Sequence, residues 1–197
     1  MIPHLRLLNK LDFYGIRSKT KQWITSFLTK RQQRVVVNGK YSNWVPVLSG
    51  VPQGTVIGPH LFLLHINDID NGVTSTTRLF ADDCLVYNSI SSPKDEEQLQ
   101  SDLNTMVDWS NTWGMKFNPS KCTTMRISRK KNLRTTYQVM GTTLEETTDN
   151  RYLGVILQND MRWNKQVSNA TNKAMKTLNF IKRNFYHTST GTKAVNL

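Results

Sequence analysis

The sequence predicts an α+β fold in which an antiparallel sheet carries packed helices on one face. Segments with apolar residues at helical spacing alternate with short pairs of β-rich segments. Asn38-Gly39 separates two of those β-rich segments, and both residue types tolerate the positive φ of a tight hairpin turn. With 197 residues, 38% of them hydrophobic, the chain is long enough to form a core.

The N-terminal part of the chain predicts two helices and a hairpin. The apolar residues from Leu5 to Leu11 form a short helical face, and Gly15 is a natural end for that helix. A second helix is predicted over 19–29. The β-rich segments 33–37 and 41–48 then form the two strands of the hairpin.

The middle of the chain predicts a loop, two helices and a second hairpin. A Gly/Pro-rich loop over 49–54 precedes a helix with Pro59 in its first turn. The segment 77–87 predicts two short strands, apolar enough to be buried, which Ala81-Asp82-Asp83 interrupts. Ser92 is the predicted cap of a long amphipathic helix that runs as far as Trp113.

The last third of the chain predicts three strands and a helix. The strands are expected over 122–128, 137–140 and 152–157, and the helix over about 164–184. No internal repeat is visible.

Positive charge dominates the composition. Lys and Arg number 26 against 14 Asp and Glu, which gives a net charge of +12. Asp12 is the one acidic residue before Asp68, and 109–144 and 161–197 contain no acidic residue. Such basic segments favour a polyanion partner held through phosphate contacts, although a solvated basic surface is the alternative.

Several classes of protein are not expected. No apolar run approaches the roughly 20 residues of a membrane span, and Pro3, His4 and Arg6 interrupt any apolar signal segment. Cys84 and Cys122 form neither a disulfide framework nor a zinc site, which favours a reducing compartment.

Asp82 and Asp83 form the first constellation with chemical meaning. Two carboxylates about 4 Å apart repel each other by about 4 kcal/mol at the effective dielectric constant of a protein site. A bound cation such as Mg²⁺ would compensate that repulsion and could assist phosphoryl transfer. A simple polar hairpin turn is the alternative.

The loop 49–54 is the second constellation. Its glycines and proline suit a close approach of the backbone to a ligand, and the amide of Gln53 can both donate and accept. A plain connecting turn is the alternative interpretation.

Four segments in the same order resemble motifs of reverse transcriptases from retroelements without long terminal repeats (LINE-like elements). Phe80-Ala81-Asp82-Asp83 resembles the aromatic-Ala-Asp-Asp motif, and Ser49 to Pro59 resembles the upstream loop-and-helix motif. Met115 to Cys122 resembles the motif with a lysine near the leaving pyrophosphate. Tyr152 to Val155 resembles the turn that grips the primer end.

The resemblance implies a polymerase palm that transfers a nucleotide from a dNTP to a primer 3′-hydroxyl with two Mg²⁺ ions. Asp82 and Asp83 would be metal ligands, and Lys121 would supply a proton or charge to the departing pyrophosphate. The residues that would contact the template or the nucleotide are Ser49, Pro52, Gln53, Gly54 and Phe80. Those that would position the primer are Tyr152, Leu153 and Gly154.

The resemblance also implies domains and partners. Residues 1–160 would form the palm, with a residual connection to the fingers, and 161–197 would begin a helical thumb. The expected partners are an RNA template, a DNA primer and a dNTP, without a membrane. The nucleus is the expected location, and the oligomeric state stays open. The thumb cations directed toward duplex would be Lys173, Lys176, Lys182 and Arg183.

One expected element of the family does not match. In the family, a strand with a metal-binding aspartate precedes a segment that resembles Ile2-Pro3-His4, and Asp12 lies on the wrong side of that segment. We therefore expect the 197-residue chain alone to be inactive or nearly so. The alternatives are a remnant that binds nucleic acid without catalysis and a product that does not fold.

Overall fold

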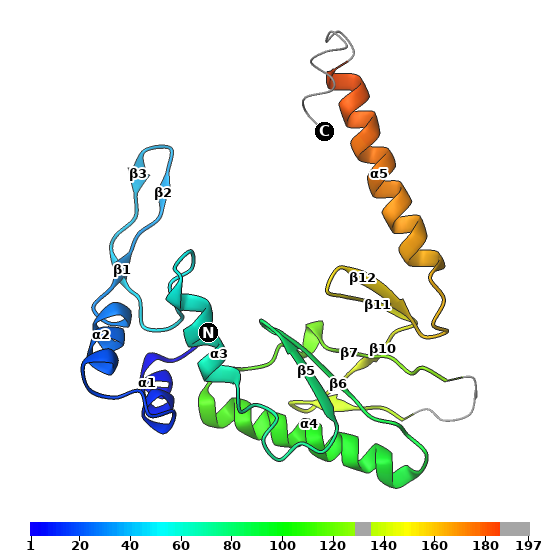
Figure 1. Ribbon diagram of the computed structural model, residues 1–197, viewed down its shortest axis with the longest axis horizontal. Coiled ribbons are helices and arrows are strands. Elements are labelled where there is room, and N and C mark those ends of the chain that lie inside the picture. The colour runs from blue at the N-terminus through cyan, green and yellow to red at the C-terminus, as the bar shows by residue number, and fades with distance from the viewer. Residues whose placement is uncertain (129–134, 186–197) are drawn as a thin grey trace. The chain divides into compact units, whose positions relative to one another are not determined.

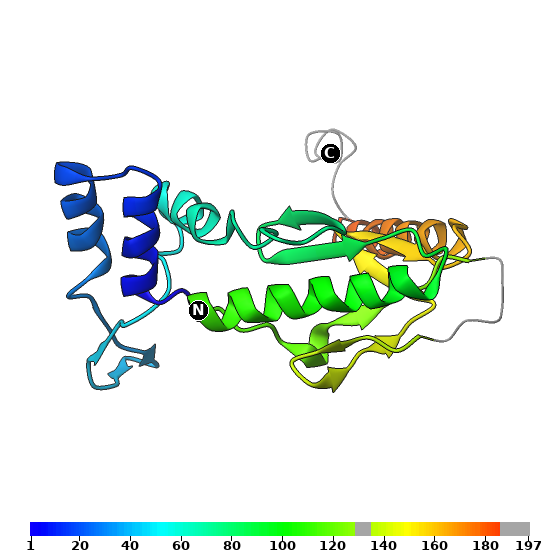
Figure 2. The same cartoon turned by 90° about the horizontal axis from the view of Figure 1, so that it is seen from below.

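The computed structural model describes residues 1–128 and 135–185, which form two compact units. One unit consists of Met1–Cys122 and Tyr137–Leu144, and the other of the described residues within 123–136 and 145–197. Figures 1 and 2 show the helices and strand pairs of both. No helix among the described residues is long and apolar enough to cross a membrane.

Three helices build the core of the first unit. They are α1 (His4–Phe13), α2 (Ser18–Leu28) and α3 (Ile57–Ile66). Their buried apolar side chains form a small cluster. Burial of one leucine side chain contributes about 1.5–3 kcal/mol to the free energy of unfolding, so this cluster is the main feature that stabilises the three helices. Its buried members are Ile2, Leu7, Leu8, Leu11, Ile24, Leu28 and Leu61.

A long hairpin lies between α2 and α3 in the chain. Its outer strands are β1 (Gln32–Gln33) and β4 (Val45–Pro46), and its inner strands are β2 (Val36–Val37) and β3 (Lys40–Tyr41). Asn38 and Gly39 form the turn with φ of 51° and 75°, which confirms the predicted hairpin position.

A second hairpin and a long helix complete most of the first unit. The strands β5 (Thr76–Phe80) and β6 (Asp83–Tyr87) pair over their full lengths, and α4 spans Pro93–Trp113. The Asp95 carboxylate accepts hydrogen bonds from the backbone N–H groups of Ser91 and Ser92, so the start of α4 is capped where the sequence predicts.

Two further contacts attach other segments to α4. The buried Asp102 carboxylate accepts from the backbone N–H groups of Thr74 and Ser75, at 3.1 and 2.7 Å. The Gln100 side chain exchanges two hydrogen bonds with the backbone of Gln138, in the short pair of β8 (Gln138–Val139) and β9 (Thr142–Thr143). Side chains of α4 therefore hold the segment that precedes β5 and the β8–β9 pair against the helix.

The second unit contains a parallel pair, a hairpin and the last helix. The parallel strands are β7 (Thr123–Thr124) and β10 (Glu145–Glu146). The hairpin strands are β11 (Asp149–Tyr152) and β12 (Val155–Gln158), and α5 spans Asn164–Asn184. The bounds of α5 agree with the prediction. None of its residues is buried, so its apolar face has no cover among the described residues.

The α+β class is confirmed, and three details of the prediction are wrong. The described strands form six two-stranded pairs instead of one antiparallel sheet, because each strand is short and pairs with a single partner. The segment 152–157 is the turn and second strand of a hairpin, since Leu153 and Gly154 have positive φ. The strands on both sides of Asp82-Asp83 are largely exposed instead of buried.

Candidate functional site

The two adjacent aspartates lie at the tip of the β5–β6 hairpin. Phe80 pairs with Asp83, so Ala81 and Asp82 form a two-residue turn between the strands. Ala81 has a φ of 49°, in the left-handed region that a residue with a Cβ rarely adopts. All four residues are exposed, and Phe80 is 60% exposed. The tip thus presents an aromatic ring and two carboxylates to solvent.

The chemistry of this tip fits a hard divalent cation. Mg²⁺ is commonly bound through one or two carboxylates, together with water molecules and substrate phosphates. Asp82 and Asp83 supply two such carboxylates on consecutive residues. The described residues contain no cluster of three or more His, Cys, Asp or Glu side chains that could hold a metal ion by themselves. Further oxygen ligands would have to come from a substrate or from water.

The segment that carries Lys121 lies near the Asp83 strand. Cys84 lies on an exposed strand, but desolvation of its thiol raises the pKa of that thiol to about 11, and electrostatic interactions with Cys122 and Asp70 add to this effect. Cys84 follows Asp83 and Cys122 follows Lys121. The two predicted site residues, Asp83 and Lys121, are therefore each adjacent in the chain to one of two cysteines that interact with each other. Lys121 ends a 3-10 turn, Pro119–Lys121, which the Asn118 side chain caps, and it is exposed.

The loop 49–54 is held by the start of the chain. Ser49 bridges with Pro3, and the Gly50 N–H donates to the carbonyl of Ile2 at 2.7 Å. The Nε2 atom of the buried His4 lies 2.8 Å from the Gly50 carbonyl oxygen. These contacts fix the first half of the loop against α1.

The second half of the loop is held by the start of α3. The Thr55 hydroxyl donates to the Pro52 carbonyl at 2.8 Å and accepts from the Gly58 N–H at 3.2 Å. A Cβ at Gly58 would lie 2.4 Å from that carbonyl oxygen, so no side chain fits there. Pro52 is buried, while Gln53 and Gly54 are exposed. The loop therefore presents Gln53 and Gly54 to solvent on a fixed base.

The predicted primer-binding residues occupy the turn of the β11–β12 hairpin in the second unit. Leu153 and Gly154 have φ of 50° and 85°, and Tyr152 pairs with Val155. Leu153 and Gly154 are exposed. Within the first unit, no hydrogen bond or ion pair of the described residues links the aspartates to the 49–54 loop or to Lys121. The aspartates, the 49–54 loop and Lys121 are therefore each positioned by a different element of the first unit.

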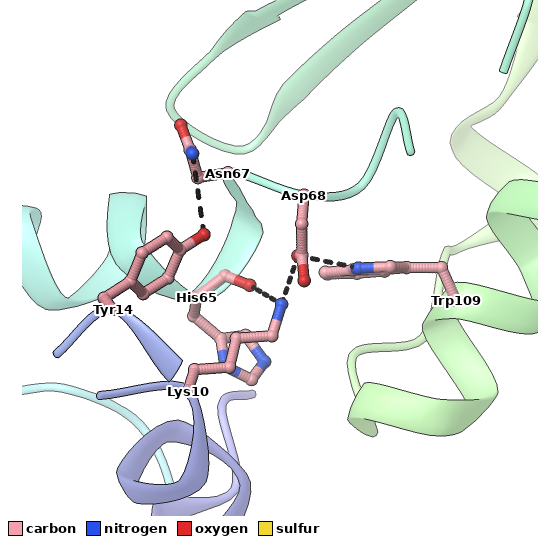
Figure 3. A network of polar contacts seen from close by, with 6 residues as sticks. All are labelled: Lys10, Tyr14, His65, Asn67, Asp68 and Trp109. Atoms are coloured by element: carbon pink, nitrogen blue, oxygen red, sulfur yellow. Dashed lines mark hydrogen bonds and ion pairs between the residues drawn. The ribbon is translucent and has the colours of Figure 1, made fainter. Parts of the chain in front are cut away.

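A buried polar network beside the helix core was not predicted (Figure 3). Lys10 is 1% exposed, and its ammonium donates to the His65 carbonyl and to the Asp68 carboxylate. The ring centroids of Trp113 and Trp109 lie 4.0 and 4.7 Å from Nζ, and the Trp109 Nε1 donates to Asp68 at 2.9 Å. Burial lowers the pKa of Lys10, and Asp68 partly offsets this. The sequence signal was a lysine three residues after Leu7, on the apolar face of α1.

His65 is the second unusual group of this network. Its ring is fully buried edge-on against Trp109 and Trp113, with centroids 6.1 and 6.2 Å apart. Burial, followed by the charge of Lys10, lowers the pKa of His65 to about 4. Neither ring nitrogen has a hydrogen bond of ordinary geometry, and the Trp113 backbone raises the pKa only weakly. The ring is therefore neutral at physiological pH.

Comparison with known proteins identifies the family. A family model described as "Reverse transcriptase (RNA-dependent DNA polymerase)" matches residues 1–157. The chain is 26% identical over 155 residues to "RNA-directed DNA polymerase from mobile element jockey" of Drosophila melanogaster, which covers 74% of this chain and 17% of that protein. It is 25% identical over 194 residues to "Probable RNA-directed DNA polymerase from transposon BS" of the same species, which covers 90% and 20%.

A third relative comes from another insect. The chain is 27% identical over 134 residues to "Retrovirus-related Pol polyprotein from type-1 retrotransposable element R2" of Popillia japonica, which covers 61% of this chain and 21% of that protein. The chain thus spans about a fifth of the length of the curated relatives it matches. Because the family model matches most of the sequence, the chain belongs to the reverse transcriptase family.

Proposed function

We propose that this chain is part of the RNA-directed DNA polymerase of a LINE-like retrotransposon. Residues 1–160 would form the palm, and 161–197 would begin the thumb, of which 186–197 lie outside the described residues. The whole enzyme would transfer a nucleotide from a dNTP to the 3′-hydroxyl of a DNA primer on an RNA template. The observation that carries the proposal is the exposed Asp82-Asp83 tip of the β5–β6 hairpin within a chain of this family.

The proposed residue roles follow the positions of the exposed groups. Asp82 and Asp83 would hold Mg²⁺, which when bound neutralises charge on the reacting phosphates. Lys121 would place its ammonium near the departing pyrophosphate, where negative charge develops.

The substrate-binding roles belong to two turns and one aromatic residue. Gln53 and Gly54, on the base formed by Ser49 and Pro52, would contact the template base and the incoming nucleotide together with Phe80. In the second unit, the turn formed by Tyr152, Leu153 and Gly154 would position the primer end. Both turns expose backbone to solvent, which suits a close approach by a nucleic acid strand.

Metal-directed cleavage tests the proposed metal site on the 197-residue chain itself. Fe²⁺ in place of Mg²⁺, with ascorbate and peroxide, cleaves the backbone close to a bound ion. We expect mass spectrometry to find new termini near residues 80–84, and the double variant Asp82→Asn/Asp83→Asn to lose them. Asp108→Asn, which removes an exposed carboxylate of α4, is the matched control. Unchanged cleavage in the double variant would contradict the assignment.

Primer extension tests the proposed reaction. Because the chain spans about a fifth of its relatives, we expect the chain alone, with an annealed RNA template and DNA primer, dNTPs and Mg²⁺, to give no extension. Extension that Asp83→Asn abolishes would support the reaction and overturn this expectation of inactivity. Extension that Asp83→Asn leaves intact would contradict the role of the tip.

A further inference from the structure

The hairpin between α2 and α3 exposes a surface that the proposed site does not use. Every residue from Gln32 to Pro46 is exposed. Figures 1 and 2 show the hairpin extending from the helix pair α1–α2. An isolated two-stranded hairpin is at best marginally stable in water, and contiguous exposed apolar surface marks an interaction site.

One face of this hairpin combines flat aromatic rings with a guanidinium. Side chains two residues apart, and side chains of directly paired residues, point to the same face. Val36 pairs with Tyr41, and Arg34 contacts the Tyr41 ring, so Arg34 lies on the same face. The guanidinium carbon of Arg34 lies 4.0 Å from the Tyr41 ring centroid and 4.6 Å from that of Trp44. The rings remain 61% and 56% exposed, so they have free surface for another planar group.

The positive charge of the hairpin favours an anionic partner. Arg31 directly precedes the hairpin, Lys40 adds a positive charge on its opposite face, and no acidic residue occurs between Asp12 and Asp68. Lys30, which lies between α2 and the hairpin, adds an exposed cation at the base of the hairpin. Basic side chains interleaved with aromatic rings are the combination that binds single strands, because phosphates meet the cations and bases stack on the rings.

We propose that the hairpin 32–46 binds single-stranded nucleic acid. Bases would stack on Tyr41 and Trp44, and Arg34 would contact the phosphates. The strand would be the unpaired part of the template, and this identification rests on the proposed function. Strand β4 ends at Pro46, three residues before Ser49, so a strand on the hairpin lies close in the chain to the proposed template loop.

Binding to short oligonucleotides tests the proposal. The probe is a fluorescein-labelled, mixed-sequence 20-nucleotide RNA, and its anisotropy is followed as the full 197-residue chain is added. We expect Trp44→Ala to weaken binding about tenfold through the loss of one stacked base. We expect Arg34→Gln to weaken it as well, and to reduce the slope of log K against log salt by about 0.7.

Two substitutions in α2 are matched controls. Trp23→Ala removes an exposed aromatic ring and Lys19→Gln an exposed cation, both outside the hairpin. We expect each control to change the affinity less than twofold. If the controls weaken binding as much as Trp44→Ala, or if Trp44→Ala has no effect, the hairpin is not the binding surface.

Photocrosslinking of the unmodified chain gives a second measurement that does not depend on a variant. We expect ultraviolet crosslinks to RNA on a peptide containing Tyr41 or Trp44. A dimer that Trp44→Ala dissociates, with RNA binding unchanged, would show instead that a second copy covers the hairpin, and would overturn the proposal.

The outcomes separate this proposal from the proposed function. Hairpin-dependent RNA binding without metal-directed cleavage at Asp82-Asp83 would leave the binding surface and remove the catalytic assignment. Cleavage at the Asp82-Asp83 tip together with RNA binding that does not depend on the hairpin would leave the metal-site assignment and remove the proposed binding surface.

Discussion

Lys10 is a buried cation whose charge is balanced by a carboxylate that follows α3 and by aromatic rings of α4. Asp68 supplies the counter-charge, while Trp109 and Trp113 supply ring faces within 5 Å of Nζ. Removing one partner of a buried pair leaves the other charge uncompensated, at a cost of about 3–5 kcal/mol. The ion pair between Lys21 and Asp12 is partly exposed, and such pairs contribute at most about 1 kcal/mol.

This contrast gives the first stability prediction. We expect Lys10→Met to lower the free energy of unfolding by about 3 kcal/mol, because Asp68 loses its counter-ion. Lys21→Met should change it by less than about 1 kcal/mol. Urea unfolding followed by tryptophan fluorescence measures both. Equal effects of the two substitutions would mean that Lys10 is not buried as described.

His65 gives the chain a predicted acid sensitivity. Its pKa in the folded protein is about 4, against 6.5 for an ordinary histidine, so the unfolded chain binds more protons between these values. The contribution of the neutral, buried His65 ring to the free energy of unfolding is therefore fully present above pH 6.5 and is lost as the pH falls toward 4. At about 1.4 kcal/mol for each pKa unit, the loss is about 3 kcal/mol.

His65→Phe is the test, since a phenyl ring can keep the edge-on contacts with Trp109 and Trp113. We expect the variant to reduce the fall in unfolding free energy between pH 6.5 and 4. His60→Gln, at an exposed position, should leave that fall unchanged. An unchanged pH dependence in His65→Phe would assign the acid sensitivity to other groups.

At the scale of elements, the start of α3 and the 49–54 loop behave as one piece. The carbonyl of Pro52 lies so close to Gly58 that a Cβ would be 2.4 Å from it. Alanine normally stabilises a helix relative to glycine by about 1 kcal/mol, so this close approach reverses the usual sign.

We therefore expect Gly58→Ala to lower the free energy of unfolding by about 1–2 kcal/mol and to displace the loop. Ser101→Ala, at an exposed position of α4, is the control and should be neutral or slightly stabilising. Thermal unfolding by circular dichroism measures both. A more stable Gly58→Ala variant would show that the loop is free to move away from α3.

The turns of two hairpins show which features of an element depend on the local sequence alone. Asn38-Gly39 was predicted as a turn because the residue types permit positive φ, and both residues adopt it. The strand predicted over 152–157 was wrong because Leu153 adopts a φ of 50°, a conformation that its side chain does not favour. Pairing of 149–152 with 155–158 imposes this turn, so the tertiary context outweighed local preference.

At the scale of the whole molecule, the net charge of +12 predicts salt-dependent binding of nucleic acid. We expect the affinity for a primer–template duplex, measured by anisotropy, to fall at least tenfold between 50 and 200 mM NaCl, because bound cations release counterions from the phosphates. An uncharged peptide nucleic acid strand is the control and should show no such fall. A salt-independent affinity would exclude phosphate contacts as the basis of binding.

The sequence by itself determined the helices, the Asn38-Gly39 turn, the positive charge and the family, because each is encoded in residues close along the chain. It placed α5 at its observed bounds and Asp82-Asp83 where one strand turns into the next. Only the tertiary structure decided which side chains are buried, since burial depends on segments far apart in sequence. It thereby enclosed Lys10 and His65 with α4 and left the hairpin 32–46 exposed.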